Sequence, residues 1–375
     1  MDFHIPRNTL LAGIRKTLGI VEKKTTQPIL NNVLLRIKEN RLTIIATDVE
    51  TTLVANYGAE VLSGGEITVS AKKLYEMIRE IPEGIVHVKR NEGNTLVVSC
   101  QKAVYRISGI PAEEFPSIGE ENSELSLCPL EKGILLDLIG KSFFAISQDE
   151  TRPNLTGAFL EAEESGGGSS ILRMVATDGH RLAVVDSVPT GQKVSCLPKG
   201  VIIPRKGLLE IKRLLEEDNT GDVFFGIDGG LCVIKSGEDV LKVSLIDAEF
   251  PNYRRVIPQE KGINVSVEKE KILHALKRIN VISSEGYGGV VVNVKENLMV
   301  LTFQDSEVGD ASDEIEIKYT GEEIIKSYNI NYFLAAVEVI DDQQVNFEIG
   351  IDSKPSVVRG SGNDRYMCII MPLKE

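Results

Sequence analysis

Residues 174–185 read MVATDGHRLAVV, and this stretch has a counterpart in each of the other two thirds of the 375-residue chain. Residues 44–55 read IIATDVETTLVA, and residues 299–310 read MVLTFQDSEVGD. Their aspartates, Asp48, Asp178 and Asp305, are 130 and 127 residues apart. A repeat of about 125 residues has the size of a small domain rather than of a solenoid turn. The spacing therefore predicts three tandem copies of one fold.

Other landmarks recur in step with these aspartates. Leu74, Leu208 and Leu334 are 134 and 126 residues apart, and the segment AEEFPSI at 112–118 is echoed by AEFPNY at 248–253. Several landmarks are unlikely to slip together by chance. We expect the copies to occupy residues 1–126, 127–255 and 256–375.

Apolar periodicity indicates two helices and several hairpins in each copy. A period near 3.6 predicts first helices over 7–24, 131–147 and 268–284, and second helices that begin near Ala71, Pro204 and Asn331. Alternating runs joined by turn signals predict hairpins at 31–48, 157–178 and 288–305. Each copy is then an α+β domain in which two helices lie against β-sheet.

The composition is that of a globular protein without a membrane or export signal. Hydrophobic residues make up 42% and charged residues 26%. No apolar run approaches the 18 or so residues that span a bilayer, and the N-terminal stretch does not resemble a signal peptide. The five cysteines are scattered singly, which fits reduced and mostly buried thiols. We expect a cytoplasmic protein that does not contact membranes.

The net charge of −13 argues against nucleic acid as a partner, unless the charges are segregated. The six predicted helices together carry about +5, which leaves about −18 on the strands and loops. A charged helix face is most often only a solvated surface. Its repetition in successive copies favours a positive surface built from helices, with candidate DNA contacts at Lys72, Lys73, Arg79, Arg205 and Lys206.

Simple dimensions decide how many helices could surround DNA. Six helices spaced about 10 Å apart leave a hole of only about 9 Å, whereas twelve leave about 28 Å. A duplex about 20 Å wide fits only the larger hole. A ring would therefore need two chains, closed head to tail by pairing an edge strand of the first copy with one of the third.

Motifs for catalysis are missing from the sequence. It has no phosphate-binding loop, dinucleotide fingerprint, nucleophile elbow or zinc-protease helix, and its four histidines are far apart. The glycines at 166–168 are better explained as a hairpin tip than as a phosphate cradle, because no helix follows them. We expect no enzyme activity, no cofactor and no metal.

The Asp-Gly pair at 178–179 is sufficiently explained as a tight turn. A turn does not account for His180 and Arg181 followed by Leu182. TDGHRLA at 177–183, FPNYRRVIP at 250–258 and the terminal IIMPLKE at 369–375 together resemble the family of the bacterial DNA polymerase III β subunit, the replicative sliding clamp. The resemblance covers the whole chain. It implies a homodimeric six-domain ring around duplex DNA that confers processivity on DNA polymerase.

The resemblance also implies a pocket between the second and third copies that binds a short linear motif of partner proteins. The implied partners are the DNA polymerase III α subunit, the clamp loader and other proteins with that motif. Apolar area flanked by a few polar groups suits apolar peptide side chains and one glutamine-like anchor. The implied pocket residues are Leu155, Thr177, Gly179, His180, Arg181, Leu182, Pro251, Arg255, Val256, Tyr287, Asn329, Tyr332, Ile369, Ile370, Met371, Pro372 and Leu373. The chain departs from the commoner family pattern by ending in Leu373-Lys374-Glu375.

Further DNA contacts and the dimer interface are also implied by the resemblance. DNA contacts would include Lys23, Lys24, Gln148 and Arg152. They should reach phosphates without sequence preference. The interface strand in SCQKAVYRISGI, residues 99–110, offers Lys102, Tyr105 and Ile107, and it would face Val281, Ile282 and an acidic segment at Glu307, Asp310, Asp313 and Glu314.

Val104 occupies a position that is basic in some members of the family, so we expect an interface that depends more on apolar contact than on charge. Two functions remain open at this point. One is a DNA tether that recruits enzymes, and the other is a tandem-repeat peptide-binding scaffold that does not act on DNA.

Overall fold

The computed structural model describes residues 1–21, 27–117, 125–165, 169–189, 197, 200–217, 221–260, 262–283, 288–362 and 364–373. They form two compact units, which divide the second copy between them. Unit 1 comprises Met1–Lys132, Ser195–Leu197 and Lys206–Leu245, and unit 2 comprises Gly133–Val194, Pro198–Arg205 and Ile246–Glu375.

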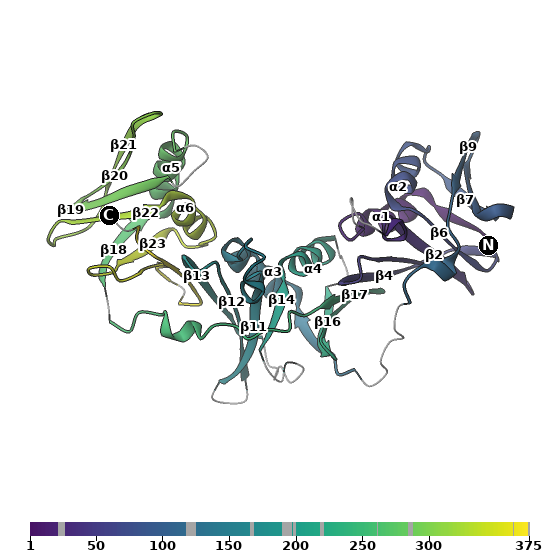
Figure 1. Cartoon of the computed structure of the whole chain (residues 1–375), viewed down its shortest axis with the longest axis horizontal. Helices are drawn as coiled ribbons and strands as arrows, with labels where there is room; N and C mark the ends of the chain where they lie inside the picture. Colours follow the sequence, from purple (N-terminus) through teal and green to yellow (C-terminus); the bar gives the residue numbers. More distant parts are fainter. Residues whose placement is uncertain are drawn as a thin grey trace. The chain divides into compact units, whose positions relative to one another are not determined.

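Unit 1 contains two β-sheets, with orders β5-β1-β7-β8-β9 and β10-β15-β16-β17-β4-β3-β2-β6 (Figure 1). The eight-stranded sheet is continuous from the first copy into the second, because β17 pairs with β4. The first-copy elements are β1 (Asp2–Pro6), α1 (Arg7–Thr17), η1 (Pro28–Asn31), β2 (Asn32–Lys38), β3 (Arg41–Thr47), β4 (Thr51–Gly58), β5 (Glu60–Ser63), β6 (Gly65–Ser70), α2 (Ala71–Glu80), β7 (Ile85–Asn91), η2 (Glu92–Asn94), β8 (Thr95–Cys100), β9 (Ala103–Ser108) and η3 (Ala112–Glu114). The second copy adds β10 (Cys128–Glu131), α4 (Arg205–Glu217), β15 (Asp222–Asp228), β16 (Leu231–Ser236) and β17 (Asp239–Ser244).

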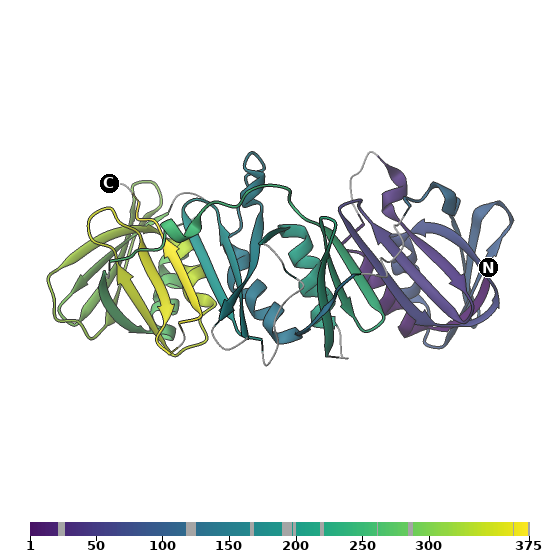
Figure 2. The same ribbon diagram turned by 90° about the horizontal axis from the view of Figure 1, so that it is seen from below.

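Unit 2 repeats this plan with sheets ordered β14-β11-β12-β13-β25-β24-β23-β18 and β21-β20-β19-β22. Its eight-stranded sheet is continuous from the second copy into the third through β13 and β25, and Figure 2 shows the strands of this sheet side by side with helices behind them. The second-copy elements are α3 (Lys132–Ser142), η4 (Phe143–Ala145), η5 (Pro153–Leu155), β11 (Gly157–Ser165), β12 (Ser169–Thr177), β13 (Arg181–Ser187) and β14 (Val201–Pro204). The linker and third-copy elements are η6 (Tyr253–Arg255), β18 (Ile263–Glu268), α5 (Lys269–Asn280), β19 (Gly289–Lys295), β20 (Leu298–Asp305), β21 (Gly309–Glu316), β22 (Ile324–Asn329), α6 (Ile330–Glu338), β23 (Gln344–Ile349), β24 (Ser356–Gly360) and β25 (Tyr366–Ile370).

The amphipathic patterns in the sequence explain how helix and sheet pack. In α2, Leu74 and Ile78 are buried on one face, while Lys72 and Lys73 are exposed on the other. The side chain of Ser70 accepts a hydrogen bond from the backbone N–H of Lys73 and so caps the N-terminus of this helix. In β20, Met299, Leu301 and Phe303 alternate into the core, as period-2 patterning predicts.

The three repeated aspartates occupy the same kind of turn. Each carboxylate accepts hydrogen bonds from backbone N–H groups two or three residues ahead. Asp48 accepts from Thr51, Asp178 accepts from His180 and Arg181, and Asp305 accepts from Glu307 and Val308. Such Asx turns fix the start of the following strand. The landmark in the sequence is therefore a hairpin turn that all three copies share.

The predicted hairpins and helix starts are confirmed, but the first helices are shorter than predicted. The helix predicted over 7–24 ends at Thr17, whose hydroxyl donates to the carbonyl of Ile14. The N–H groups of Ile20 and Val21 then bond the carbonyl of Thr17, which turns the chain so that Ile20 is buried. The helices predicted over 131–147 and 268–284 end at Ser142 and Asn280. Apolar residues just beyond each end extended the helical pattern without extending the helix.

The cysteines that the structure describes are buried, as their scattered pattern in the sequence predicts. Cys100, Cys128, Cys232 and Cys368 are buried, and Cys196 lies outside the described residues. Within the described ranges, every helix is too short or too polar to cross a bilayer.

Candidate functional site

A pocket in unit 2 is built on the turn between β12 and β13. Its volume is about 190 Å³. The residues that line it come from η5, the turn, β13, the linker that contains η6, and the end of β25: Leu155, Thr177, Gly179, His180, Arg181, Leu182, Pro251, Tyr253, Val256, Ile369 and Met371. Ten of these were predicted as pocket residues from the sequence.

The turn itself is held by Thr177 and Asp178. The hydroxyl of Thr177 accepts from the N–H of Gly179 at 3.1 Å and donates to the carbonyl of Arg181 at 2.6 Å. Gly179 has φ of +92°, and a Cβ there would lie 3.0 Å from a guanidinium nitrogen of Arg152. Glycine therefore favours the left-handed backbone here, and its missing Cβ leaves room for the guanidinium of Arg152.

Arg181 lines the pocket and is held in place by several contacts. Its side chain is 14% exposed, and its Nε lies 3.0 Å from the carboxylate of Asp178. It also donates to the carbonyl of Phe144, and its guanidinium lies 4.3 Å from the ring centroid of Tyr332. With its charge paired and its plane stacked, Arg181 shapes the wall and fixes Tyr332 rather than offering a free cation.

The floor of the pocket belongs to a larger apolar cluster. Leu182, Tyr253 and Ile369 are almost fully buried, and Phe250 stacks on Phe159 with ring centroids 5.0 Å apart. This cluster gives the pocket an apolar base on which aliphatic or aromatic side chains of a ligand could be buried. His180 and Met371 form its exposed side, and the N–H of Met371 donates to the carbonyl of His180 at 2.9 Å.

Tyr253 lines the pocket although the sequence reasoning did not assign it. Its hydroxyl donates to Glu161, and Arg173 donates to that hydroxyl at 3.3 Å. Burial, with the hydrogen bond to Glu161 second, raises the pKa of Tyr253 to about 12, so its hydroxyl stays protonated. The sequence could have indicated Tyr253 as a pocket residue, because it is the one large aromatic residue after the Phe-Pro pair in the segment FPNYRRV.

The other predicted pocket residues lie around this pocket rather than in its lining. Asn329 caps α6 by accepting from the N–H groups of Asn331 and Tyr332, and the ring of Tyr332 stacks near that of His180 with centroids 6.4 Å apart. Ile370 is fully buried, whereas Arg255 is exposed. Pro372 and Leu373 follow Met371 away from the pocket, and the N–H of Leu373 donates to the carbonyl of Ser327. Tyr287 lies outside the described residues.

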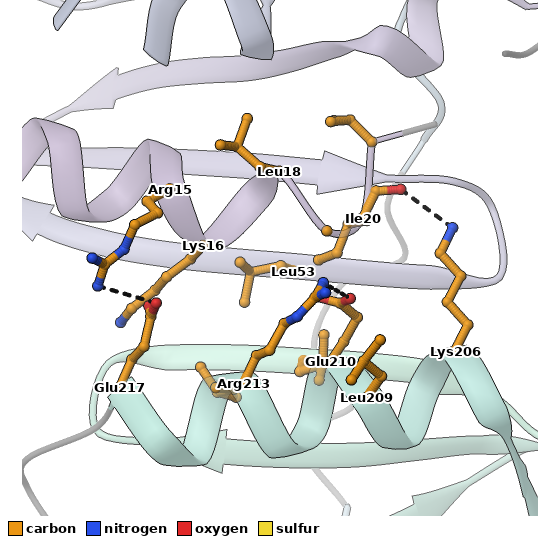
Figure 3. Close-up of a pocket in the computed structure, with 14 residues that line it drawn as sticks. Arg15, Lys16, Leu18, Ile20, Leu53, Lys206, Leu209, Glu210, Arg213 and Glu217 are labelled. Carbon is orange, nitrogen blue, oxygen red and sulfur yellow. Dashed lines mark hydrogen bonds and ion pairs between the residues drawn. The ribbon is translucent and has the colours of Figure 1, made fainter. Parts of the chain in front are cut away.

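Unit 1 contains a much larger and more polar cleft of about 730 Å³ between α1 and α4 (Figure 3). Leu53 and Leu241 form part of its floor. Arg15, Lys16, Lys206 and Arg213 point into it from the two helices, and each is paired with a carboxylate. The carboxylates are the more buried members of the pairs, so the cations lie nearer to solvent.

Two of these pairs involve strongly buried acids. The side chain of Asp48 is 2% exposed and pairs with Lys206, which also donates to the carbonyl of Ile20. Glu210 is 4% exposed and lies 2.5 Å from Arg213, yet burial raises its pKa more than Arg213 and Lys206 lower it. A Cβ at Gly19 would lie within 2.5 Å of the Glu210 carboxylate, so the glycine makes room for this pair. The pair of Asp48 and Lys206 ties the first copy to the second, whereas Glu210 and Arg213 pair within α4.

The residues predicted to contact DNA differ in their exposure to solvent and in whether another side chain of the protein already holds them. Lys72, Lys73 and Arg79 are exposed on α2, with Lys72 within 4.0 Å of Glu76 and Arg79 within 2.9 Å of Glu80. Gln148 and Arg152 are exposed, and Arg152 bonds Asp149 and the carbonyl of Asp178. Arg205 stacks over Phe143 at 4.7 Å, and Lys206 is held by Asp48. Lys23 and Lys24 lie outside the described residues.

The residues predicted for the dimer interface lie on or beside edge strands. β9 is an edge strand of the five-stranded sheet, and β21 is an edge strand of the four-stranded sheet. On β9, Val104 is 50% exposed, Lys102 just before the strand is exposed, Tyr105 is half-buried and Ile107 is buried in the core of its own unit. Val281 is 81% exposed, Ile282 is half-buried, Glu307 is exposed, and Asp313 already pairs with Arg278 at 2.6 Å.

No group of three or more histidine, cysteine or carboxylate side chains is placed to hold a metal ion in the part of the chain that the structure describes. The residues that line the two cavities offer apolar area, hydrogen bonds and paired charges.

Comparison with known proteins agrees with three copies of one fold. Three family models match in order: the N-terminal domain of the DNA polymerase III beta subunit at residues 1–119, the central domain at 129–252 and the C-terminal domain at 254–374. The beta sliding clamp of Pseudomonas aeruginosa is 31% identical and that of Escherichia coli 30% identical, each over the full length of both chains.

Solved structures show the same similarity. The Caulobacter crescentus pol III beta structure superposes with a TM-score of 0.92 at 31% identity and covers both chains completely. The Bartonella birtlesii sliding clamp, solved with bound griselimycin, gives a TM-score of 0.93 at 27% identity over both full chains. The similarity therefore extends to the whole chain.

Proposed function

The chain belongs to the DNA polymerase III beta-subunit family, and we propose that two copies of it close head to tail into a ring that encircles duplex DNA. As a replicative sliding clamp the protein is a processivity factor. We propose that it has no catalytic site of its own and works in the cytoplasm by holding its partners on DNA. The tandem scaffold without DNA is not favoured, because the relatives are sliding clamps over their full length.

Ring closure is supported by two edge strands, one in the first copy and one in the third. β9 of the first copy and β21 of the third copy each leave one side of a sheet unpaired. Antiparallel pairing of β9 with β21 of a second chain would remove both edges and leave no free end. The exposed Val104 and Val281 would add apolar contact to that interface, and Lys102 would face the acidic residues around Glu307 and Asp310.

Contact with DNA would be loose and confined to phosphates. Lys72, Lys73 and Arg79 are exposed on α2, and exposed cations of this kind bind phosphates without reading sequence. Gln148 and Arg152 are the polar candidates in unit 2. Lys206 and Arg205 are held by Asp48 and Phe143, so we expect them to contribute less. Weak contacts suit a ring that holds DNA by topology and must slide.

Partner recruitment is the role we assign to the pocket of unit 2. Its apolar floor and its polar side at His180 suit a short extended peptide with apolar side chains and one hydrogen-bonding side chain. The proposed ligands are motif peptides of the DNA polymerase III α subunit, of the clamp loader and of other replication or repair proteins.

Retention on circular DNA tests the ring directly. The protein is loaded onto nicked circular duplex DNA with a clamp loader and ATP, freed of unbound protein by gel filtration, and the DNA is then cut once. We expect the protein to remain on the circle and to be lost after the cut, because a topological link has no other escape. Equal loss from circular and linear DNA would contradict the ring.

The dimer interface has its own test in sedimentation. We expect the dimer to dissociate little more at 1 M than at 0.1 M NaCl, because Val104 occurs where a second cation would strengthen charge pairing. Val104→Arg is the matched variant and should make dissociation more sensitive to salt. Steep dissociation of the natural protein with salt would contradict an interface that depends mainly on apolar contact.

A further inference from the structure

A row of charged side chains lies on the sheet of unit 2 near the pocket. Glu161 of β11, Arg173 of β12 and Asp186 of β13 are directly opposite one another in the register of the three strands. Nε and Nη2 of Arg173 donate to the two carboxylate oxygens of Asp186 at 2.6 and 2.7 Å. Only 15–21% of each of the three side chains is exposed. This charged row is therefore held more firmly than an ion pair in open solvent.

The next two rows on the same face of the sheet lead to the pocket. Side chains two residues apart on a strand share a face, so Phe159, Val175 and Val184 continue the face beside the charged row. One row further, Thr177 and Leu182 are opposite each other and line the pocket. The charged row and the pocket are thus separated by a single apolar row.

Tyr253 spans this apolar row. Its side chain belongs to the apolar cluster and lines the pocket. Its hydroxyl donates to Glu161 and accepts from Nη1 of Arg173 at 3.3 Å. The guanidinium of Arg254 lies 4.7 Å from the ring centroid and donates to Glu161 at 2.7 Å. Since Glu161 and Arg173 are not among the lining residues, their contact with the pocket runs through Tyr253.

Tyr253 also belongs to the linker segment that carries other pocket residues. Pro251 and Val256, which line the pocket, are two and three residues from Tyr253. Residues 247–260, all of them described, contain η6 but no β-strand, so a ladder of backbone hydrogen bonds does not hold this segment against the sheet. A hydrogen bond from a tyrosine hydroxyl to a shielded carboxylate is strong. It fixes where this part of the linker lies on the sheet.

We propose that Glu161 and Arg173 are positioning residues of the peptide site, which hold the hydroxyl of Tyr253 and so keep the linker in the arrangement that receives a peptide. This inference rests on the proposed peptide function of the pocket. It accounts for a tyrosine at 253, because a phenylalanine ring would also fill the apolar floor but could not bond the charged row. Such preorganisation raises affinity, since the linker need not become ordered when the ligand binds.

Calorimetry with one synthetic peptide measures the effect. The probe has about five residues, one glutamine and otherwise mainly leucine and phenylalanine. Tyr253→Phe keeps the ring that lines the pocket and removes only the hydroxyl. We expect it to weaken binding about five- to tenfold, the factor that one net hydrogen bond ordering the site before binding would give.

Variants of Glu161 separate this hydrogen bond from the charge of the row. Glu161→Ala should weaken binding by about the same factor as Tyr253→Phe, whereas Glu161→Gln keeps an acceptor oxygen and should restore most of the affinity. Glu163→Ala is the matched control, because Glu163 is on the same strand and also pairs with Arg173 and Arg254. It should change the affinity by less than about twofold.

The double variant of Tyr253→Phe and Glu161→Ala should bind no more weakly than either single variant, because both changes remove the same bond. The chemical shift of the Tyr253 Cζ carbon gives a second readout, which a general loss of stability would not produce. It should move in Glu161→Ala, toward the value of a tyrosine hydroxyl in water, and stay in place in Glu163→Ala.

Unchanged affinity in Tyr253→Phe and Glu161→Ala would overturn the inference. So would additive weakening in the double variant, weakening by Glu163→Ala as large as that by Glu161→Ala, or a Cζ shift that does not move in Glu161→Ala. Failure of the natural protein to bind the probe would instead contradict the peptide function of the pocket.

Discussion

The turn at Thr47–Thr51 in unit 1 and the turn at Thr177–Arg181 in unit 2 have the same backbone and different side chains. In both, a threonine hydroxyl accepts from the N–H two residues ahead, at 3.0 and 3.1 Å, and an aspartate accepts from the N–H three residues ahead. The chain segment beside each turn also bonds to it in the same way. The N–H of Ser244 donates to the carbonyl of Glu50, and the N–H of Met371 donates to the carbonyl of His180.

The difference lies in three consecutive residues. Unit 2 has Gly-His-Arg at 179–181 and unit 1 has Val-Glu-Thr at 49–51. Val49 keeps the left-handed φ of +81° that Gly179 adopts at +92°, although a β-branched residue is strained there. The carboxylate of Asp178 pairs with Arg181 in its own turn, whereas that of Asp48 pairs with Lys206 of α4. The shared backbone thus supports, in one unit, the pocket that we propose binds a peptide and, in the other, a junction between copies.

The largest expected effect comes from removing the distant partner of Asp48. Lys206→Ala leaves a carboxylate that is 2% exposed without its cation, and loss of one partner of a buried pair is costly. We expect the free energy of unfolding to fall by about 3 kcal/mol in urea denaturation. Adding Asp48→Asn to Lys206→Ala should recover part of this loss, since the charge is then gone. A loss below about 0.5 kcal/mol would show that the pair is merely a surface contact.

The next effect concerns Gly179. In Gly179→Val the side chain would be strained at a φ of +92° and would press on Arg152, whose nitrogen lies 3.0 Å from the expected Cβ. We expect a loss of about 2 kcal/mol in stability, with at least a tenfold weaker binding of a short synthetic peptide that has one glutamine and otherwise mainly leucine and phenylalanine. Gly229→Val, at a φ of +51° in the turn between β15 and β16, is the control for backbone strain alone. It should destabilise the protein without changing its affinity for the peptide.

The reverse change in unit 1, Val49→Gly, should stabilise the folded protein. Val49 is 64% exposed, so Val49→Gly loses little packing and relieves a strained backbone. We expect a gain of about 1 kcal/mol in the free energy of unfolding, the strain relief minus the greater entropy of an unfolded glycine. Thermal unfolding followed by circular dichroism measures it. A lower melting temperature for Val49→Gly would show that the valine makes a favourable contact at this turn.

The smallest effect is a pH dependence in the cleft of unit 1. Burial raises the pKa of Glu210 above its unfolded value, so the folded state holds this proton more tightly. Protonated Glu210 therefore contributes its whole stabilisation below the pKa of the carboxyl in the unfolded chain, about 4.3. This contribution is lost as the pH rises through the higher pKa of the carboxyl in the folded protein. Glu210→Gln should flatten the decline in stability on going from pH 4 to pH 6. Glu216→Gln, at an exposed position on the same helix, should leave it unchanged.

The sequence was sufficient to predict the repeat, the hairpins and the helix starts. Asp48, Asp178 and Asp305 mark the same turn because the local hydrogen bonds of an Asx turn depend on one residue. Helix ends were less predictable, since Leu18 and Val21 continue the helical spacing beyond Thr17, where the chain instead turns and buries Ile20.

The pocket was predictable only in part, for a physical reason. Residues on the repeated turn could be found from TDGHRL, but Tyr253 enters through a long-range bond to Glu161, 92 residues away. Arg205 and Lys206 were expected to be free cations, yet stacking on Phe143 and pairing with Asp48 depend on tertiary contacts that a charge pattern does not contain. The contacts of Tyr287, Lys23 and Lys24 stay predictions.

The central claim is that unshared residues on a shared turn make the peptide site. Replacing 179–181 by Val-Glu-Thr, the residues at 49–51, tests it when binding of the short peptide is measured by calorimetry. We predict that the exchanged protein keeps its dimer and its retention on circular DNA but binds the peptide at least tenfold more weakly. Unchanged peptide affinity in the exchanged protein would contradict the account.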